Sequence, residues 1–142
     1  SPIGLKNGNL MGMRSDDLSA QVVSAIIKKN KTINPEILDD LVFGCAFPEG
    51  SQGMLMSKGI SILSDLPITV GAKIVNRFCG SSMDAVHQVS TSIESNDIHF
   101  GIAGGVEDMF GVPMGGGWPS FNDQLSQKDF YIGMELLYIL ER

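Results

Sequence analysis

The chain has 142 residues, which suffices for one domain of ordinary size and is too short for two domains with separate cores. A hydrophobic fraction of 43% excludes a disordered chain, since that much apolar side chain can form a core. The net charge of −6 argues against a nucleic-acid binder, and no apolar run approaches the ~20 residues that a membrane span needs.

The first predicted element is a helix that begins at Ser15 or Asp16, either of which can cap it, and ends near Lys29. Acidic residues in its first turn and lysines in its last turn suit the helix dipole. The apolar residues that recur along it at helical spacing are Leu18, Val22, Ala25, Ile26 and Ile27. Residues 34–36 (Asn-Pro-Glu) have the order cap, first-turn proline and acid, which predicts a short helical turn. The apolar run at 41–47 predicts a strand that is buried on both faces.

The rest of the chain is predicted to alternate strands with helices. The segments are a loop at 48–53, a helix at about 54–64, a strand at 72–76, a helix at about 79–94, a strand at 99–106 and a helix at about 129–142. The helix at 79–94 places Met83, Val86, Val89 and Ile93 on one face. Strands that alternate with helices imply parallel strands joined by crossovers, which is an α/β layered fold.

The two cysteines, Cys45 and Cys79, supply neither a disulfide framework nor the spacing of metal ligands. We therefore expect a reducing, cytoplasmic setting and no metal site. Cys79 falls where a buried strand runs through a tight turn into a helix. A thiol there meets the positive end of the helix dipole and unpaired backbone N–H groups, which stabilise a thiolate and can bind an oxyanion. This pattern fits a nucleophile, but most free cysteines are core residues, and these residues alone leave both interpretations open.

Residues 75–86 (VNRFCGSSMDAV) resemble the acyl-enzyme signature of the thiolases. Three further matches follow in order and with compatible spacing: SPIG at 1–4, GCAFPEG at 44–50, and AGGVEDM with VPMG at 103–115. The GCAFPEG stretch is similar to one that is common in the degradative, 3-ketoacyl-CoA branch of the family. Because these segments cover nearly the whole chain, the resemblance identifies Cys79 as the nucleophile.

The resemblance implies a layered αβαβα fold built from two similar halves, and a homodimer or a tetramer formed as a dimer of dimers. Residues 1–142 would be a partial N-terminal domain without its first strand, with 111–142 as the start of a loop domain. The implied reaction begins when the Cys79 thiolate attacks the 3-keto carbon of a 3-ketoacyl-CoA and acetyl-CoA leaves. A fresh CoA thiol then accepts the shortened acyl group, so coenzyme A is a substrate and no cofactor is implied.

Three motifs that thiolases use in catalysis do not occur in this sequence: the histidine of G-H-P, the second cysteine of C-x-G and the asparagine of N-E-A-F. His87 and His99 do not match that histidine, so we expect both at the surface or in packing, and we expect Cys45 to be structural. Met134 would match a residue that lines the acyl site, on the resemblance of residues 131–134. We therefore expect the isolated chain to lack turnover and, with apolar surface exposed, to associate.

Two alternatives remain beside a degradative thiolase. A biosynthetic acetoacetyl-CoA thiolase shares the same cysteine segment, and the GCAFPEG stretch favours the degradative branch only moderately. A non-catalytic thiolase-like module for dimerisation or binding is the second alternative. Ketoacyl synthases and 3-hydroxy-3-methylglutaryl-CoA synthases share the fold and a cysteine, but the AGGVE-x-M segment beside V-N-R-x-C argues against them.

Overall fold

The structure is a computed structural model that describes residues 4–113. Within this range, three parallel strands form a sheet in the order β2-β1-β3. The strands are β1 (Asp40–Gly44), β2 (Gly71–Val75) and β3 (Gly101–Gly105), and the helices are α1 (Ser15–Lys29), α2 (Met56–Leu63) and α3 (Ser81–Glu94). Strands and helices alternate along the chain, so the predicted α/β fold is confirmed. The helix predicted at 129–142 lies outside the described residues.

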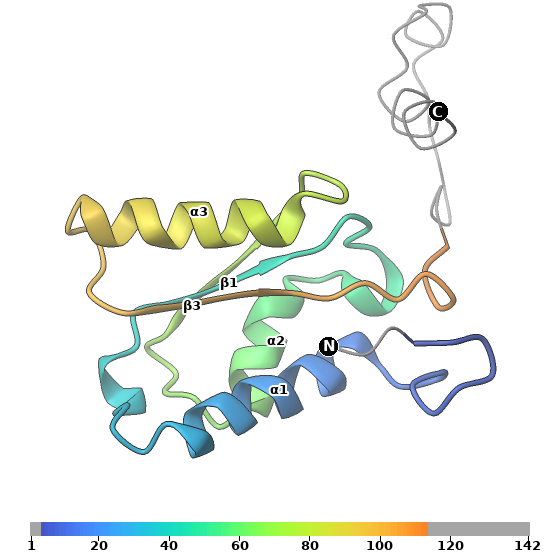
Figure 1. Ribbon diagram of the computed structural model, residues 1–142, viewed down its shortest axis with the longest axis horizontal. Helices are drawn as coiled ribbons and strands as arrows, with labels where there is room; N and C mark the ends of the chain where they lie inside the picture. The colour runs from blue at the N-terminus through green and yellow to red at the C-terminus, as the bar shows by residue number, and fades with distance from the viewer. Residues whose placement is uncertain (1–3, 114–142) are drawn as a thin grey trace, which may run out of the picture.

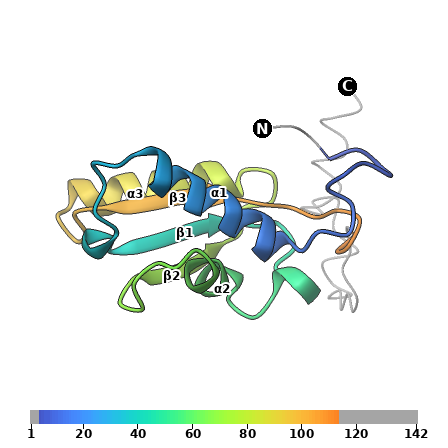
Figure 2. The same cartoon turned by 90° about the horizontal axis from the view of Figure 1, so that it is seen from below.

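The sheet separates two layers of helices (Figure 1). Helices α1 and α2 cover one face, and α3 lies along the other, as the perpendicular view also shows (Figure 2). Side chains of β1 alternate between the two layers, because Leu41 and Phe43 join the core under α1 and α2 while Val42 packs with α3. The central strand is thus buried on both faces, as its continuous apolar run predicts.

Helix α1 has the predicted extent, but its cap and its buried face differ from the prediction. Arg14 is the cap residue, and Ser15 lies inside the helix, where its hydroxyl donates to Gln52 Oε1 at 3.2 Å. The buried residues of α1 are Ser15, Ser19, Ala20 and Val23, whereas Val22 and Ile26 of the predicted stripe are exposed. Because these buried side chains are small, α1 packs directly against α2. The buried face of α1 is therefore not the one that the spacing of its apolar residues indicates.

Two short 3-10 helices complete the connections, at Pro35–Ile37 and Gly50–Gln52. The first confirms the predicted helical turn, because Asn34 Oδ1 accepts from the backbone N–H of Glu36 at 3.1 Å. No helix in the described part of the chain is both long and apolar enough to cross a membrane.

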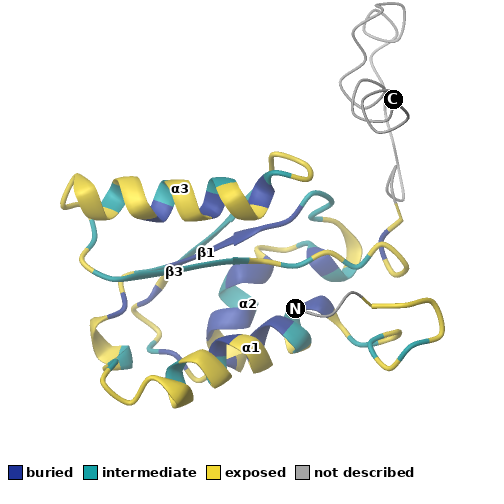
Figure 3. Cartoon of the chain, viewed as in Figure 1, coloured by how far each residue is buried: buried dark blue, intermediate teal, exposed yellow. Residues whose placement is uncertain are grey.

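Helix α3 turns to the sheet a face that shares only Val89 with its apolar stripe. The residues that it buries are Ser81, Ala85 and Val89, while Met83 is 78% exposed and Val86 is 56% exposed. The outward face of α3 is accordingly coloured as exposed along much of its length (Figure 3). Small residues are buried here because the strands beneath α3 present glycines, and only small side chains fit between the helix and a glycine surface.

Two of these glycines show how close the helix lies. A Cβ atom added at Gly44 would overlap the backbone of Ser81 and Ser82, where α3 begins. A Cβ atom added at Gly101 would come within 2.9 Å of Val89 Cγ1. The start of α3 is therefore seated directly on the carboxyl end of β1, and this contact positions the turn that precedes the helix.

Candidate functional site

Three loops leave the carboxyl-terminal edge of the sheet, and hydrogen bonds join them. They are residues 45–49 after β1, 76–80 after β2 and 106–110 after β3. Asn76 Nδ2 donates to the carbonyl of Ala46 at 2.9 Å, and a carboxylate oxygen of Glu107 accepts from the N–H of Ala46 at 2.7 Å. Open α/β sheets bind their ligands beyond this edge, so these loops form the candidate site.

Cys79 lies in the turn between β2 and α3, directly before Gly80, the cap residue of the helix. The turn is closed by backbone bonds from Gly80 N to Arg77 O and from Ser81 N to Phe78 O, both 3.0 Å. The buried hydroxyl of Ser81 accepts from Arg77 N at 2.9 Å and donates to Phe78 O at 2.5 Å. Cys79 itself is exposed, so it is not a core packing residue of the described fold.

Phe78, the residue before Cys79, has an unusual backbone conformation. Its φ of 45° lies in the left-handed region, which costs a bulky residue roughly 1–2 kcal/mol. Its N–H donates to Asn76 Oδ1 at 2.9 Å, and its ring lies 6.1 Å from the ring of Phe47, centroid to centroid. Such a conformation persists only where surrounding contacts fix it, so the turn that carries Cys79 is held from both sides.

A further glycine allows the third loop to approach the turn. A Cβ atom added at Gly105 would overlap the hydroxyl of Ser82 and lie 2.9 Å from the carbonyl oxygen of Gly44. The ends of β1 and β3 and the first turn of α3 thus meet without intervening side chains. This close approach brings the residue pair Cys79 and Gly80 to the same sheet edge as the other two loops.

The other cysteine, Cys45, is buried at the end of β1, and its Sγ lies 3.7 Å from Glu107 Oε1. Burial, and then the negative charge of Glu107, raise the pKa of the Cys45 thiol to about 11. A thiol that keeps its proton at neutral pH is a poor nucleophile. These surroundings match the structural role predicted for Cys45.

Two polar residues that join the loops, Gln52 and Glu107, were not predicted from the sequence. Gln52 is fully buried (0% exposed), and its Nε2 donates to Phe47 O at 2.8 Å and to Glu107 Oε1 at 2.9 Å. Its Oε1 accepts from Ser15 Oγ at 3.2 Å and from Asp108 N at 2.6 Å. No local pattern marks a glutamine as buried when its partners lie up to 56 positions away. The signal that was present is Glu107, a carboxylate two residues after the half-buried, glycine-rich strand β3.

The remaining predicted residues lie elsewhere. His87 and His99 are exposed, as predicted, and His99 precedes β3 with its Nδ1 at 4.0 Å from Asp39 Oδ2. Met134 lies outside the described residues. Among residues 4–113, no three His, Cys, Asp or Glu side chains lie together in a way that could hold a metal ion.

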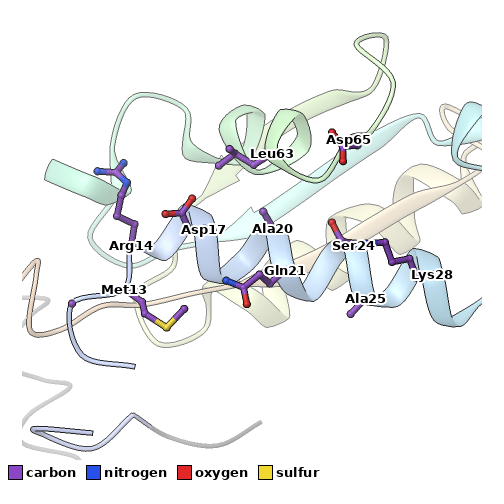
Figure 4. A pocket seen from close by; sticks show the side chains of 11 residues that line it. Met13, Arg14, Asp17, Ala20, Gln21, Ser24, Ala25, Lys28, Leu63 and Asp65 are labelled. Atoms are coloured by element: carbon purple, nitrogen blue, oxygen red, sulfur yellow. The ribbon is translucent and has the colours of Figure 1, made fainter. Parts of the chain in front are cut away.

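An open groove of about 690 Å³ lies between α1 and the end of α2 (Figure 4). Arg14, Asp17 and Lys28 contribute charged side chains from the α1 side, and Leu63 and Asp65 line it from the other. Cys79 and the loop residues around it do not line this groove. The groove is therefore separate from the candidate site at the sheet edge.

Known proteins resemble this chain in sequence and in fold. Residues 1–134 match the family model described as "Thiolase, N-terminal domain". The chain is 41% identical over 115 residues to a 3-ketoacyl-CoA thiolase of Colwellia psychrerythraea, covering 80% of this chain and 30% of that protein. It is 38% identical over 113 residues to a beta-ketoadipyl-CoA thiolase of Acinetobacter baylyi, with coverage of 80% and 28%.

A crystal structure of the Bacillus anthracis acetyl-CoA acetyltransferase superposes with a TM-score of 0.71 at 25% identity, covering 77% of this chain and 27% of that one. The chain thus spans less than a third of the length of each of these relatives. The match to the family model extends over nearly the whole sequence and includes the Cys79 turn and the loops after all three strands. The chain therefore belongs to the thiolase family.

Proposed function

We propose that Cys79 is the acyl-accepting nucleophile of a thiolase that cleaves 3-ketoacyl-CoA with CoA. The observation that carries this proposal is the place of Cys79: an exposed thiol in a fixed turn, directly ahead of α3 and at the ligand-binding edge of a parallel sheet. The three residues that follow it, Gly80, Ser81 and Ser82, are small.

The proposed chemistry has two half-reactions. The Cys79 thiolate attacks the 3-keto carbon, the bond between C2 and C3 breaks, and the carbanion of acetyl-CoA takes up a proton as it leaves. The thiol of a second CoA then loses its proton and attacks the Cys79 thioester, which releases the shortened acyl-CoA and restores the thiolate. A thioester suits this sequence because it stays activated toward a second thiol.

The degradative direction is part of the proposal and rests on the GCAFPEG segment and on relatives named 3-ketoacyl-CoA thiolase. A biosynthetic acetoacetyl-CoA thiolase is the second candidate, favoured by the fold match to an acetyl-CoA acetyltransferase. We propose acyl-CoA and CoA as the partners and a homodimer or tetramer as the assembly, both from the family resemblance. We propose the cytoplasm as the setting because the two cysteines supply no disulfide framework. No cofactor enters the proposed chemistry.

The proposal predicts where an acyl group attaches. The chain is incubated with acetyl-CoA, with acetoacetyl-CoA or with a longer 3-ketoacyl-CoA, and the adduct is located by peptide mass spectrometry. We expect one acyl group, on Cys79, and no CoA-dependent turnover, because the sequence lacks the G-H-P histidine that activates the cysteine. An adduct that persists in Cys79→Ser, or equal labelling of Cys45, would contradict the proposal.

A further inference from the structure

We propose that Asn76 and Glu107 are positioning residues for Cys79, acting through the backbone of the loop after β1. This inference rests on the proposed role of Cys79 as a nucleophile. Neither residue is adjacent to Cys79 in sequence, and Glu107 belongs to a different strand connection. Their contacts nevertheless form a continuous path to the residue that precedes the thiol.

The path begins at Glu107, whose carboxylate receives hydrogen bonds from the loop after β1. Its Oε2 accepts from Ala46 N at 2.7 Å, and its Oε1 accepts from Phe47 N at 3.3 Å. Gln52 Nε2 donates to the same Oε1 at 2.9 Å and holds the carboxylate from the buried side. Hydrogen bonds to an ionised acceptor are roughly twice as strong as neutral ones, so this set fixes the peptide of Ala46.

The path continues through the carbonyl of Ala46, which faces the next loop. Asn76 Nδ2 donates to that carbonyl at 2.9 Å, and this contact sets the orientation of the Asn76 amide. Its Oδ1 then points to the N–H of Phe78 and accepts from it at 2.9 Å. One side chain thus couples the loop after β1 to the strained residue of the Cys79 turn.

The contact at Phe78 matters because of its backbone conformation. Its φ of 45° is unfavourable for a phenylalanine, and the bond from Asn76 stabilises it from one side. The Ser81 hydroxyl holds the Phe78 carbonyl from the other side. Without the Asn76 acceptor, Phe78 can relax toward negative φ, and Cys79 then leaves its place ahead of α3.

The experiment measures how fast iodoacetamide modifies Cys79 in the 142-residue chain and in variants, with peptide mapping to separate Cys79 from Cys45. We expect Asn76→Ala to slow the modification at least about fivefold, because the thiol then moves away from the start of α3. Asn76→Asp keeps the acceptor oxygen for Phe78 N–H but replaces the donor to Ala46 with a carboxylate oxygen, which breaks the link to Glu107. We expect Asn76→Asp to recover part of the rate that Asn76→Ala loses.

Glu107→Ala is expected to slow the modification about two- to threefold, because Glu107 is further along the path from Cys79 than Asn76 is. The rate of Glu107→Gln should lie between that of Glu107→Ala and that of the parent chain. Glu94→Gln and Asn9→Ala make matching chemical changes at exposed sites outside the path, and their rates should equal the parent's. If Glu107→Ala does not fold, Glu107→Gln carries the test. Amide hydrogen exchange at Phe78 reports directly on the Asn76 bond and should accelerate in Asn76→Ala.

The inference is overturned if amide exchange at Phe78 accelerates in Asn76→Ala while the modification rate of Cys79 stays within twofold of the parent's. It is also overturned if Cys79 is modified as slowly in Asn76→Asp as in Asn76→Ala. A purely structural role would lower the melting temperature of Asn76→Ala and Asn76→Asp alike, without separating their rates. Acylation by acyl-CoA is measured separately. Unchanged variant rates with normal acylation would refute only the positioning role, whereas changed rates without acylation would refute only the proposed function.

Discussion

The two thiols of this chain lie at the ends of neighbouring strands and have opposite surroundings. Cys45 is buried beside the Glu107 carboxylate, which raises its pKa to about 11, whereas Cys79 is exposed in the turn before α3. In the folded chain at pH 7.5 we therefore expect iodoacetamide to label Cys79 and to leave Cys45 unlabelled. After unfolding in urea, both cysteines should be labelled at similar rates, as peptide mapping would show.

The raised pKa of Cys45 also links its proton to stability. The unfolded chain releases this proton near the ordinary pKa of 9.0, while the folded chain keeps it up to about 11. The folded state binds the proton more tightly, so its stabilising contribution is complete below pH 9 and is lost as the pH rises toward 11.

We expect the free energy of unfolding to fall by about 2 kcal/mol across this interval because of Cys45 alone. Urea titrations at several pH values should show this fall in the parent chain and in Cys79→Ser. The fall should be much smaller in Cys45→Ser. An equal fall in Cys45→Ser would contradict the linkage.

At the scale of elements, α3 is seated on the sheet through glycines rather than through large apolar side chains. Gly105→Ala inserts a methyl group where the Ser82 hydroxyl already lies, and we expect a loss of about 1–3 kcal/mol of stability from this overpacking. Gly59, in α2, is the matched control because nothing lies within 4 Å of an added Cβ. Gly59→Ala should stabilise the chain by about 0.5–1 kcal/mol through helix propensity. Urea unfolding of both variants measures the contrast, and equal effects would contradict the proposed seating.

The packing of α2 offers a second matched pair of serines. Ser57 and Ser61 are both buried, but Ser57 Oγ donates to Leu41 O at 2.7 Å, whereas among residues 4–113 the Ser61 hydroxyl has no hydrogen-bond partner. Ser57→Ala should cost about 1 kcal/mol, because it leaves the Leu41 carbonyl without that donor. Ser61→Ala should be neutral or stabilising, because it removes a desolvated, unpaired group. Thermal melting should give a lower melting temperature for Ser57→Ala and an unchanged or higher one for Ser61→Ala; a lower melting temperature for both would contradict this account.

The elements themselves could be predicted from sequence because their signals are local. The run at 41–47 lacks polar residues, and the Asn-Pro-Glu turn carries its own cap, so both were found within a few residues of their observed positions. The buried face of α3 could not be predicted in this way, since it is set by Gly44, Gly101 and Gly105 on strands distant in sequence. The Cys79 position followed from its motif, whereas Gln52 and Glu107 act through long-range hydrogen bonds that no spacing reveals.

At the scale of the whole molecule, the described fold leaves apolar side chains exposed on the outer face of α3. Met83 and Val86 are the most exposed of them, and contiguous apolar surface of this kind favours association. We expect sedimentation velocity to show species larger than a monomer that increase with protein concentration. The double variant Met83→Gln/Val86→Gln should reduce this association, while His87→Gln on the same helix should not. A monodisperse, cooperatively melting monomer would contradict the expectation.

The most direct test of the central claim is the rate at which acetyl-CoA acylates Cys79 in the folded chain, relative to the same chain unfolded in urea. If the fold presents Cys79 as a nucleophile, the folded chain should react at least about tenfold faster, because the turn places the thiol at the start of α3. Equal rates in the two states would mean that the fold adds nothing to the reactivity of this thiol. That result would contradict the claim that this fold prepares Cys79 for acylation, and it would favour a non-catalytic thiolase-like module.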